Sequence, residues 1–501
     1  MSTIRRQSII SSGIVYSGFA LGALNTFLFT WKHGFSLEEY GLTSIFMVIG
    51  SLMYFFANLG SQAYIYKFYP YYHDNLPREK NDMMSWALLV SILGFILVIV
   101  AGIVFKKFVI QKFGGNSPVL IKYYNWVFPF GFGLTLYSLL EAFAWQLKRS
   151  ILTNFLREFQ FRLFTTVLIL LTLSGILRGF DIFVKFYSFS YILLASILLV
   201  ILVKDRQIYF PFSLTRVTKK FLPKILTMVS LVWGGGLVYN VSFFFAQLVI
   251  ASVIPNGMAM VAVYTLAQFI ASLIQAPQRV IISASISPLS RAWKDKDYPK
   301  INHIYRQSSI NQLIFSIGMF VLLWVNFTDG VLTFDLKSAY LDARYVFLFI
   351  GLTRIVDMGT GLNSQIIGTS SFWRFDFFTG ILLAVLTLPL NYILAKEKGI
   401  IGPAIADLIT FSIYNGIRFL FLYRKFGMQP FNNKTLLTIL TGLAAYLIVN
   451  YLFAAHQGLV WLFARSITFL LIYAAGVLGL RLSDDILPVW NTLLKRLYLK
   501  R

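Results

Sequence analysis

Two residues of opposite charge, Arg354 and Asp357, lie near the middle of a long apolar segment of this sequence. A charged side chain inside the hydrocarbon of a bilayer is costly, so it marks either a structural pair or a functional site. Their spacing of three residues places both side chains on one helical face, where they could pair. Alternatively, Arg354 could bind an anionic group with Asp357 holding it, because a planar guanidinium matches phosphate oxygens.

Other charged residues within apolar segments are candidates by the same argument: Glu141, Glu158, Arg162, Arg279, Arg344, Asp407, Arg418 and Arg465. Glu158 and Arg162 are four residues apart on a predicted helix, which predicts a neutralising pair. Long arginine side chains near the ends of a span can reach the lipid headgroups. This snorkelling is the expectation for Arg279, Arg344, Arg418 and Arg465.

Neutral polar residues recur along four apolar segments at helical spacing. Ser44, Ser51, Asn58 and Gln62 fall on one predicted face, as do Gln268, Ser272, Gln275 and Arg279. Asn25 lies in line with Ser11 and Gly18, and Asn240 lies in line with Gln247. A polar helix face must turn away from lipid toward protein or water. We therefore predict a central hydrophilic cavity lined by Arg354, Arg279, Gln268, Gln275, Asn240, Gln247, Asn25, Asn58 and Asp357, although polar contacts between helices would give the same pattern.

The composition requires a membrane to surround these residues. The 501 residues are 57% hydrophobic and only 13% charged, about half the charged share of a soluble protein. Apolar runs long enough to span a bilayer occur fourteen times, and none alternates as a barrel strand would. They cover residues 8–30, 41–66, 83–105, 118–145, 153–176, 181–203, 224–252, 258–285, 308–327, 340–367, 375–395, 400–424, 433–455 and 459–480. The sequence predicts an all-α polytopic membrane protein.

The distribution of Lys and Arg predicts the orientation of the spans. With the N-terminus inside, inside segments hold 28 of these residues and outside connectors hold 8. This bias predicts that both termini are cytoplasmic. The matching polar faces suggest two pseudo-symmetric lobes, with residues 1–210 and 211–430 as the halves and 431–501 as two further spans and a tail. The tail, residues 484–501, has the pattern of an interfacial amphipathic helix that binds membrane lipids.

Several function classes are disfavoured by what the sequence lacks. The chain has no cysteine, and its four histidines form no metal-ligand spacing. It contains no phosphate-binding loop of the ATPase type. Its net charge of +24 is spread between apolar segments instead of gathering on one face, which argues against nucleic acid as a partner. The predicted outside connectors are too short for the catalytic domain of a transferase or polymerase, so we expect a transporter with no catalytic residue, metal or cofactor.

Two stretches resemble bacterial oligosaccharide flippases of the Wzx type. The first is the N-terminal region 8–72, with Glu38-Glu39-Tyr40-Gly41 between two spans and Lys67-Phe68-Tyr69-Pro70-Tyr71-Tyr72 after them. The second is Leu390-Asn391-Tyr392-Ile393, followed by Gly399-Ile400-Ile401-Gly402-Pro403-Ala404-Ile405-Ala406. These flippases belong to the multidrug/oligosaccharidyl-lipid/polysaccharide (MOP) exporter superfamily, and the resemblance extends over essentially the whole chain.

The resemblance implies that the chain moves a polyprenyl-diphosphate-linked oligosaccharide across the bacterial inner membrane by alternating access. The product would enter biosynthesis of a cell-surface polysaccharide such as lipopolysaccharide O-antigen, with a polysaccharide polymerase as a possible partner. The alternative within the same superfamily is a drug/cation antiporter, which needs a carboxylate inside the membrane. The first two spans carry no acidic residue, whereas Glu141, Asp357 and Asp407 could serve that purpose.

Overall fold

The computed structural model describes residues 3–485, without the side chains of residues 3–12, 231, 235, 239, 279, 280, 283 and 373. Throughout this range the ordered elements are helices and no strand occurs, which confirms the predicted all-α class. The chain divides into two compact units, Met1–Ala262 and Val263–Arg501, and the division falls inside α13 (Gly257–Ser272). The amphipathic tail predicted from residue 484 onward lies almost wholly outside the described residues.

The lobe boundaries predicted at residues 210 and 430 were drawn from the internal repeat and stay a prediction. The division into compact units assigns α12 (Arg216–Val253) to the first unit, where it packs against α2 and α3. Trp233 of α12 donates its indole N–H to the carbonyl of Phe55, at 2.8 Å.

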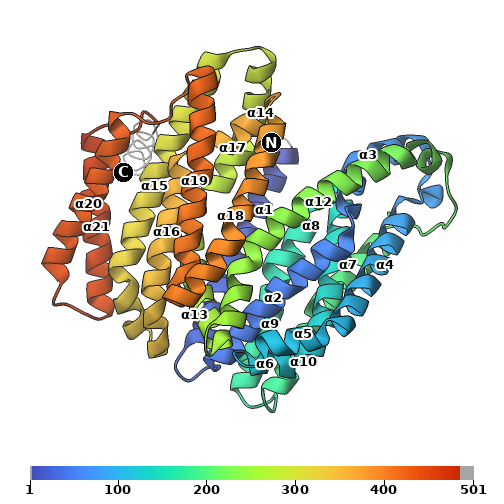
Figure 1. Cartoon of the computed structure of the whole chain (residues 1–501), viewed down its shortest axis with the longest axis horizontal. Coiled ribbons are helices and arrows are strands. Elements are labelled where there is room, and N and C mark those ends of the chain that lie inside the picture. The colour runs from blue at the N-terminus through green and yellow to red at the C-terminus, as the bar shows by residue number, and fades with distance from the viewer. Residues whose placement is uncertain (1–2, 486–501) are drawn as a thin grey trace, which may run out of the picture. The chain divides into compact units, whose positions relative to one another are not determined.

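Helix α7 (Val127–Gln146) lies at the centre of the first unit, between α2 and α11, and α4 packs beside it (Figure 1). Fourteen of its twenty residues are buried. The other helices of this unit are α1 (Thr3–Thr30), α2 (Leu37–Asn58), α3 (Ser61–Asn75), α4 (Met83–Val104), α5 (Lys106–Phe113), α6 (Pro118–Lys122), α8 (Ser150–Asn154), α9 (Phe161–Leu173), α10 (Phe180–Ser188) and α11 (Ser190–Lys204).

The predicted span 41–66 is two helices. A reciprocal cap between Ser36 and Glu39 starts α2, and Leu59 and Gly60 end it with positive φ angles of 44° and 76°. The continuous polar face predicted from Ser44 to Gln62 is therefore wrong beyond Asn58. The Asn58 side chain accepts the backbone N–H of Gln62 across the break, at 3.1 Å.

Close backbone contact joins α2 and α4. A Cβ atom added at Gly94 of α4 would collide with the carbonyl oxygen of Ala57 on α2. We expect Gly94→Ala to lower the free energy of unfolding by about 1–3 kcal/mol, the usual cost of overpacking. Thermal unfolding in detergent measures the change. Gly416→Ala is the control, because a Cβ atom there meets nothing within 4 Å; equal melting temperatures for the two variants would contradict the prediction.

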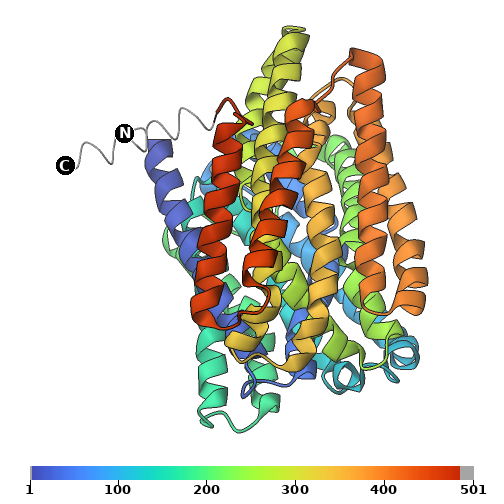
Figure 2. The same cartoon turned by 90° about the vertical axis from the view of Figure 1, so that its left-hand side faces the viewer.

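In the second unit, α19 (Ile401–Phe426) packs against α16 (Ala343–Gly359) and α18 (Trp373–Lys398). Helices α20 (Asn433–Phe453) and α21 (Leu459–Gly479) form a pair that packs against α15 (Tyr298–Thr333), as Figure 2 shows in red and yellow. Two shorter helices complete the unit, α14 (Gln278–Lys294) and α17 (Asn363–Gly368).

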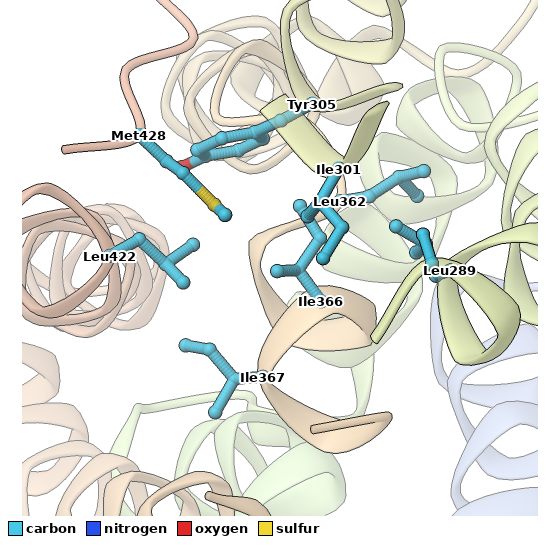
Figure 3. Packing of buried hydrophobic residues seen from close by; sticks show 9 residues of the cluster. Leu289, Ile301, Tyr305, Leu362, Ile366, Ile367, Leu422 and Met428 are labelled. Carbon is cyan, nitrogen blue, oxygen red and sulfur yellow. The ribbon is translucent and has the colours of Figure 1, made fainter. Parts of the chain in front are cut away.

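An apolar core fixes the two short helices of this unit. Side chains from α14, α15, α17 and α19 converge there together with Met428 (Figure 3). The buried members are Leu289, Ala292, Ile301, Tyr305, Leu362, Ile366, Ile367, Leu422 and Met428. Close packing of these side chains joins α14 and α17 to the long helices of the unit.

Eleven helices in the described range are long and apolar enough to cross a membrane, so the chain is a multi-pass membrane protein. The three predicted spans missing from this set are interrupted helices. Span 258–285 breaks between α13 and α14, where Pro277 supplies no N–H. Span 340–367 breaks at Gly361, whose φ is +67°. Span 153–176 runs through a π-helical segment, Phe155–Gln160, before α9.

Candidate functional site

A connected polar network lies in the second unit beside two of the helix breaks. The Asp357 carboxylate, near the end of α16, accepts hydrogen bonds from Gln278 Nε2 at 2.9 Å and Asn415 Nδ2 at 3.4 Å. The Asn415 amide oxygen accepts from Thr360 Oγ1 at 3.0 Å and from Asn363 Nδ2 at 2.9 Å. Since α14 and α17 begin at these breaks, the interrupted backbone places Gln278 beside the Asp357 carboxylate and Asn363 beside the Asn415 amide oxygen.

Among the described residues, Arg354 and Asp357 do not form a direct pair, which was one of the two possibilities that the sequence left open. Within the described residues, Arg354 forms no ion pair, and its buried Nε has no hydrogen-bond partner. Asp357 is instead held by neutral amides, which reach it because α14 and α19 pack beside α16 and α17. The N–H groups of the half-buried Arg354 guanidinium therefore remain available to donate hydrogen bonds.

Two other groups of the second unit interact electrostatically with Arg354. One is the Asp407 carboxylate of α19, and the other is the buried hydroxyl of Tyr264 on α13. Asp407 also accepts a long hydrogen bond from Asn391 Nδ2, at 3.4 Å. Arg354 thus lies in a polar region that includes a carboxylate but forms no close pair with it.

Two arginines expected to snorkel are buried and paired, so that expectation is wrong for them. Arg418 pairs with Asp376 of α18 and lies over the Tyr414 ring, 3.8 Å from its centroid. Arg465 of α21 lies 3.5 Å from Asp329 of α15 and donates to two backbone carbonyls. The partners are far apart in sequence, so helix spacing could not indicate them. Arg344 lies over the Trp324 ring, at 4.5 Å.

Glu141 and Glu158 of the first unit each form an ion pair with an arginine. Glu158 and Arg162 pair at 3.1 Å, which confirms the predicted neutralisation. Glu141 of α7 pairs with Arg157 of the π-helical segment, at 2.9 Å. Arg157 was not among the charged candidates from the sequence, so this contact was not predicted. Within the described residues, no group of His, Asp and Glu could hold a metal ion.

The other predicted cavity residues are placed as follows. Asn25 is buried between α1 and α9, where it donates to the Arg162 carbonyl at 2.9 Å and accepts from Thr166 Oγ1 at 2.6 Å. Asn240 donates to the Gly236 carbonyl of its own helix, at 2.7 Å. Gln247 is buried on α12, and Gln268 is half-buried on α13.

The predicted stripe from Gln268 to Arg279 does not lie on one helix. The half-buried Gln275 lies in the turn between α13 and α14, and Arg279 is the second residue of α14, with its side chain outside the described set. The break at Pro277 invalidates the helical spacing on which the stripe rests. Whether these residues bind substrate stays a prediction.

Four polar residues of this region were not predicted, because they are neither charged nor part of a regular stripe on one helix: Gln278, Asn363, Asn391 and Asn415. One usable signal was present: Pro277 and Gly361 interrupt apolar segments, and such interruptions point to binding sites in transporters. The partners across the network could not have been inferred, because they lie on separate helices.

We expect Asn415→Leu to lower the free energy of unfolding by about 1–3 kcal/mol. The change removes a donor from Asp357 and the acceptor of the buried Asn363 amide, which is left unpaired. Thermal unfolding in detergent measures the loss. Ser412→Ala is the control, because Ser412 is exposed on the same helix and bonds only its own turn; an equal melting temperature for the two variants would contradict the prediction.

The arrangement can bind and orient an anion but offers little for covalent chemistry. The unpaired guanidinium supplies charged donors, and the nearby amides can exchange hydrogen bonds with hydroxyl groups. The helices, their breaks and this membrane-embedded network together have the architecture of a multi-pass transporter fold.

Comparison with known proteins agrees with that fold. No family model matches this sequence, and no curated protein matches it. Among solved structures, the chain is similar to the lipid II flippase MurJ in its inward closed conformation, with 17% identity, a TM-score of 0.73, and coverage of 94% of this chain and 99% of MurJ. It is also similar to an inward-facing multidrug resistance MATE family transporter of the MOP superfamily, with 15% identity, a TM-score of 0.63, and coverage of 84% and 98%. At these identities the likeness establishes a shared fold.

Proposed function

We propose that this protein is a Wzx-type flippase of the MOP exporter superfamily. Its substrate would be a polyprenyl-diphosphate-linked oligosaccharide, moved across the bacterial inner membrane by alternating access for synthesis of a surface polysaccharide. The observation that carries the proposal is the half-buried Arg354 guanidinium of α16, which has no ion-pair partner among the described residues.

The chemistry of the headgroup supports this substrate class. A diphosphate and its sugars cannot cross hydrocarbon unaided, because their charges and hydroxyls would lose water without replacement. Arg354 would replace the water around the phosphates, and neutral amides would replace it around the sugar. The MurJ match is in keeping with this class, since that protein is described as a lipid II flippase and spans nearly the same length of chain.

The second candidate is a drug/cation antiporter, and Asp407 is the observation that favours it. This carboxylate lies on a membrane helix with one long hydrogen bond, from Asn391. A cationic drug or a coupling ion would bind a carboxylate, whereas it would be repelled by Arg354. The MATE match is compatible with this reading.

The deciding experiment compares the sidedness of lipid-linked oligosaccharide in a strain with and without this protein. We expect the glycolipid to accumulate in the cytoplasmic leaflet without the protein and to reach the outer leaflet when it is restored. If the glycolipid reaches the outer leaflet equally well without the protein in a strain that has no related flippase, the flippase proposal fails. Resistance to cationic drugs, tested in the same pair of strains, would then support the antiporter.

A further inference from the structure

The ion pair between Glu141 and Arg157 is asymmetric in its exposure. The Glu141 side chain is only 3% exposed, whereas the Arg157 side chain is 47% exposed. One carboxylate oxygen accepts from Arg157 Nη1 at 2.9 Å, and the other, Oε1, is buried without a hydrogen-bond partner among the described residues. The arginine can thus be reached from outside the helix bundle, while the glutamate depends on it.

Among the described titratable groups around Glu141, Arg157 is the one that compensates its negative charge. Glu158, on the same π-helical segment, is already paired with Arg162 at 3.1 Å. The other titratable groups that interact with Glu141 are tyrosines of α2, α3, α7 and α11, namely Tyr54, Tyr66, Tyr137 and Tyr191. A phenol is neutral near pH 7, so these four cannot compensate a carboxylate charge.

Arg157 lies in a π-helical segment and pairs with Glu141 of α7. The extra residue per turn in Phe155–Gln160 shifts the register of side chains around the helix. Arg157 and Glu158 are consecutive in this segment and pair with Glu141 and Arg162, respectively. Such single-turn π segments often occur at functional sites, because they expose side chains that a regular helix would direct elsewhere.

An anion that binds Arg157 in place of Glu141 removes the positive charge that compensates the carboxylate. A diphosphate has more negative charge and more acceptor oxygens than one carboxylate, so it competes well for the guanidinium. When Arg157 turns to the diphosphate, Glu141 stays behind as a buried charge without compensation. Such a charge costs several kcal/mol, and a proton taken from water removes it by converting the carboxylate to a neutral carboxylic acid.

We propose that Glu141 is a proton-binding site whose occupancy is controlled by Arg157, and that Arg157 is a binding residue for the diphosphate headgroup. This inference rests on the proposed flippase function and deepens it. Binding of the headgroup to Arg157 is linked to uptake of one proton by Glu141, and release of the headgroup is linked to loss of that proton.

Proton linkage in the purified full-length protein tests the proposal. The probe is farnesyl diphosphate, a short-chain lipid diphosphate, titrated by calorimetry at pH 7 in two buffers with different ionisation enthalpies. The difference in heat between the buffers reports the number of protons bound with the ligand. We expect wild type to take up about one proton more per bound ligand than Glu141→Gln, because only the carboxylate can be neutralised.

Further variants separate the roles of the pair. Arg157→Gln should weaken binding of farnesyl diphosphate roughly tenfold, as expected for loss of a charged hydrogen bond. Glu158→Gln is the matched control for Glu141→Gln, because it removes a neighbouring carboxylate that pairs with Arg162, and it should leave the proton count unchanged. Melting temperatures of all variants identify any that do not fold. Ionisation of the diphosphate contributes equally to every variant, so the difference between variants isolates Glu141.

The outcomes distinguish this inference from the proposed function. If wild type and Glu141→Gln bind farnesyl diphosphate with the same proton uptake, the proton site is wrong and the flippase proposal is unaffected. If Glu158→Gln reduces the uptake as much as Glu141→Gln does, the assignment to Glu141 is wrong. If folded wild type does not bind the probe, the role of Arg157 in binding the diphosphate is wrong, and leaflet sidedness still decides the flippase proposal.

Discussion

Replacing Arg354 with Gln is expected to reduce transport of lipid-linked oligosaccharide roughly 10- to 100-fold, with little loss of folded protein. A hydrogen bond to a charged group contributes about 1.5–3 kcal/mol, and Arg354 has no ion pair among the described residues that its removal would disrupt. Arg354→Lys should retain part of the activity, since it keeps the charge but loses the planar fork. The rate at which the glycolipid appears in the outer leaflet is the measurement.

Asp407→Asn is the matched comparison for this experiment. It removes the carboxylate that interacts electrostatically with Arg354 and keeps a side chain of nearly the same shape. If the protein is a flippase, we expect Asp407→Asn to reduce the transport rate slightly and Arg354→Gln to reduce it strongly. The opposite order, with Arg354→Gln tolerated and Asp407→Asn inactive, would contradict the flippase proposal and favour the cation antiporter.

The largest loss of stability is expected from Arg465→Met. Asp329 is only 4% exposed, and its carboxylate lies 3.5 Å from Arg465. Removing one member of a buried ion pair leaves the other uncompensated, at a cost of about 3–5 kcal/mol. The free energy of unfolding in detergent, from denaturant titration or thermal unfolding, measures the change.

The double variant Asp329→Asn with Arg465→Met tests the reason for that loss. Removing both charges should restore most of the stability, because a neutral pair has no uncompensated charge. The Asn side chain can still accept the backbone N–H of Gly458, which bonds Asp329 at 2.9 Å. A double variant as unstable as Arg465→Met alone would show that packing, and not charge, accounts for the loss.

Hydropathy was sufficient to predict the membrane helices but not their interruptions. Every one of the fourteen predicted spans contains helix, because an apolar run of about 20 residues has few alternatives in lipid. Pro277 was a visible reason for the break before α14. The π-helical segment Phe155–Gln160 contains neither Pro nor Gly, so nothing local in the sequence indicated it.

The candidate site was predictable only in its charged members. Arg354, Asp357 and Glu141 were identified because charge within an apolar run is conspicuous. Their partners were not, since Gln278 is 79 residues from Asp357 and Asn415 is 58 residues from it. Pairing across such distances depends on which helices pack together, and the polar pattern of a single helix contains no such information.

The pair of Asp329 and Arg465 also constrains how the chain is made. Arg465 bonds the carbonyl of Val325, which is 140 residues earlier in the chain. At about 5–20 residues per second, synthesis of the intervening chain takes roughly 7–28 s. During that time α15 carries a carboxylate with no guanidinium to meet it, four residues from its end at Thr333. Asp329 therefore stays without its ion-pair partner until α21 has been synthesised. A ribosome that stops before α21 leaves a nascent chain that cannot form this ion pair.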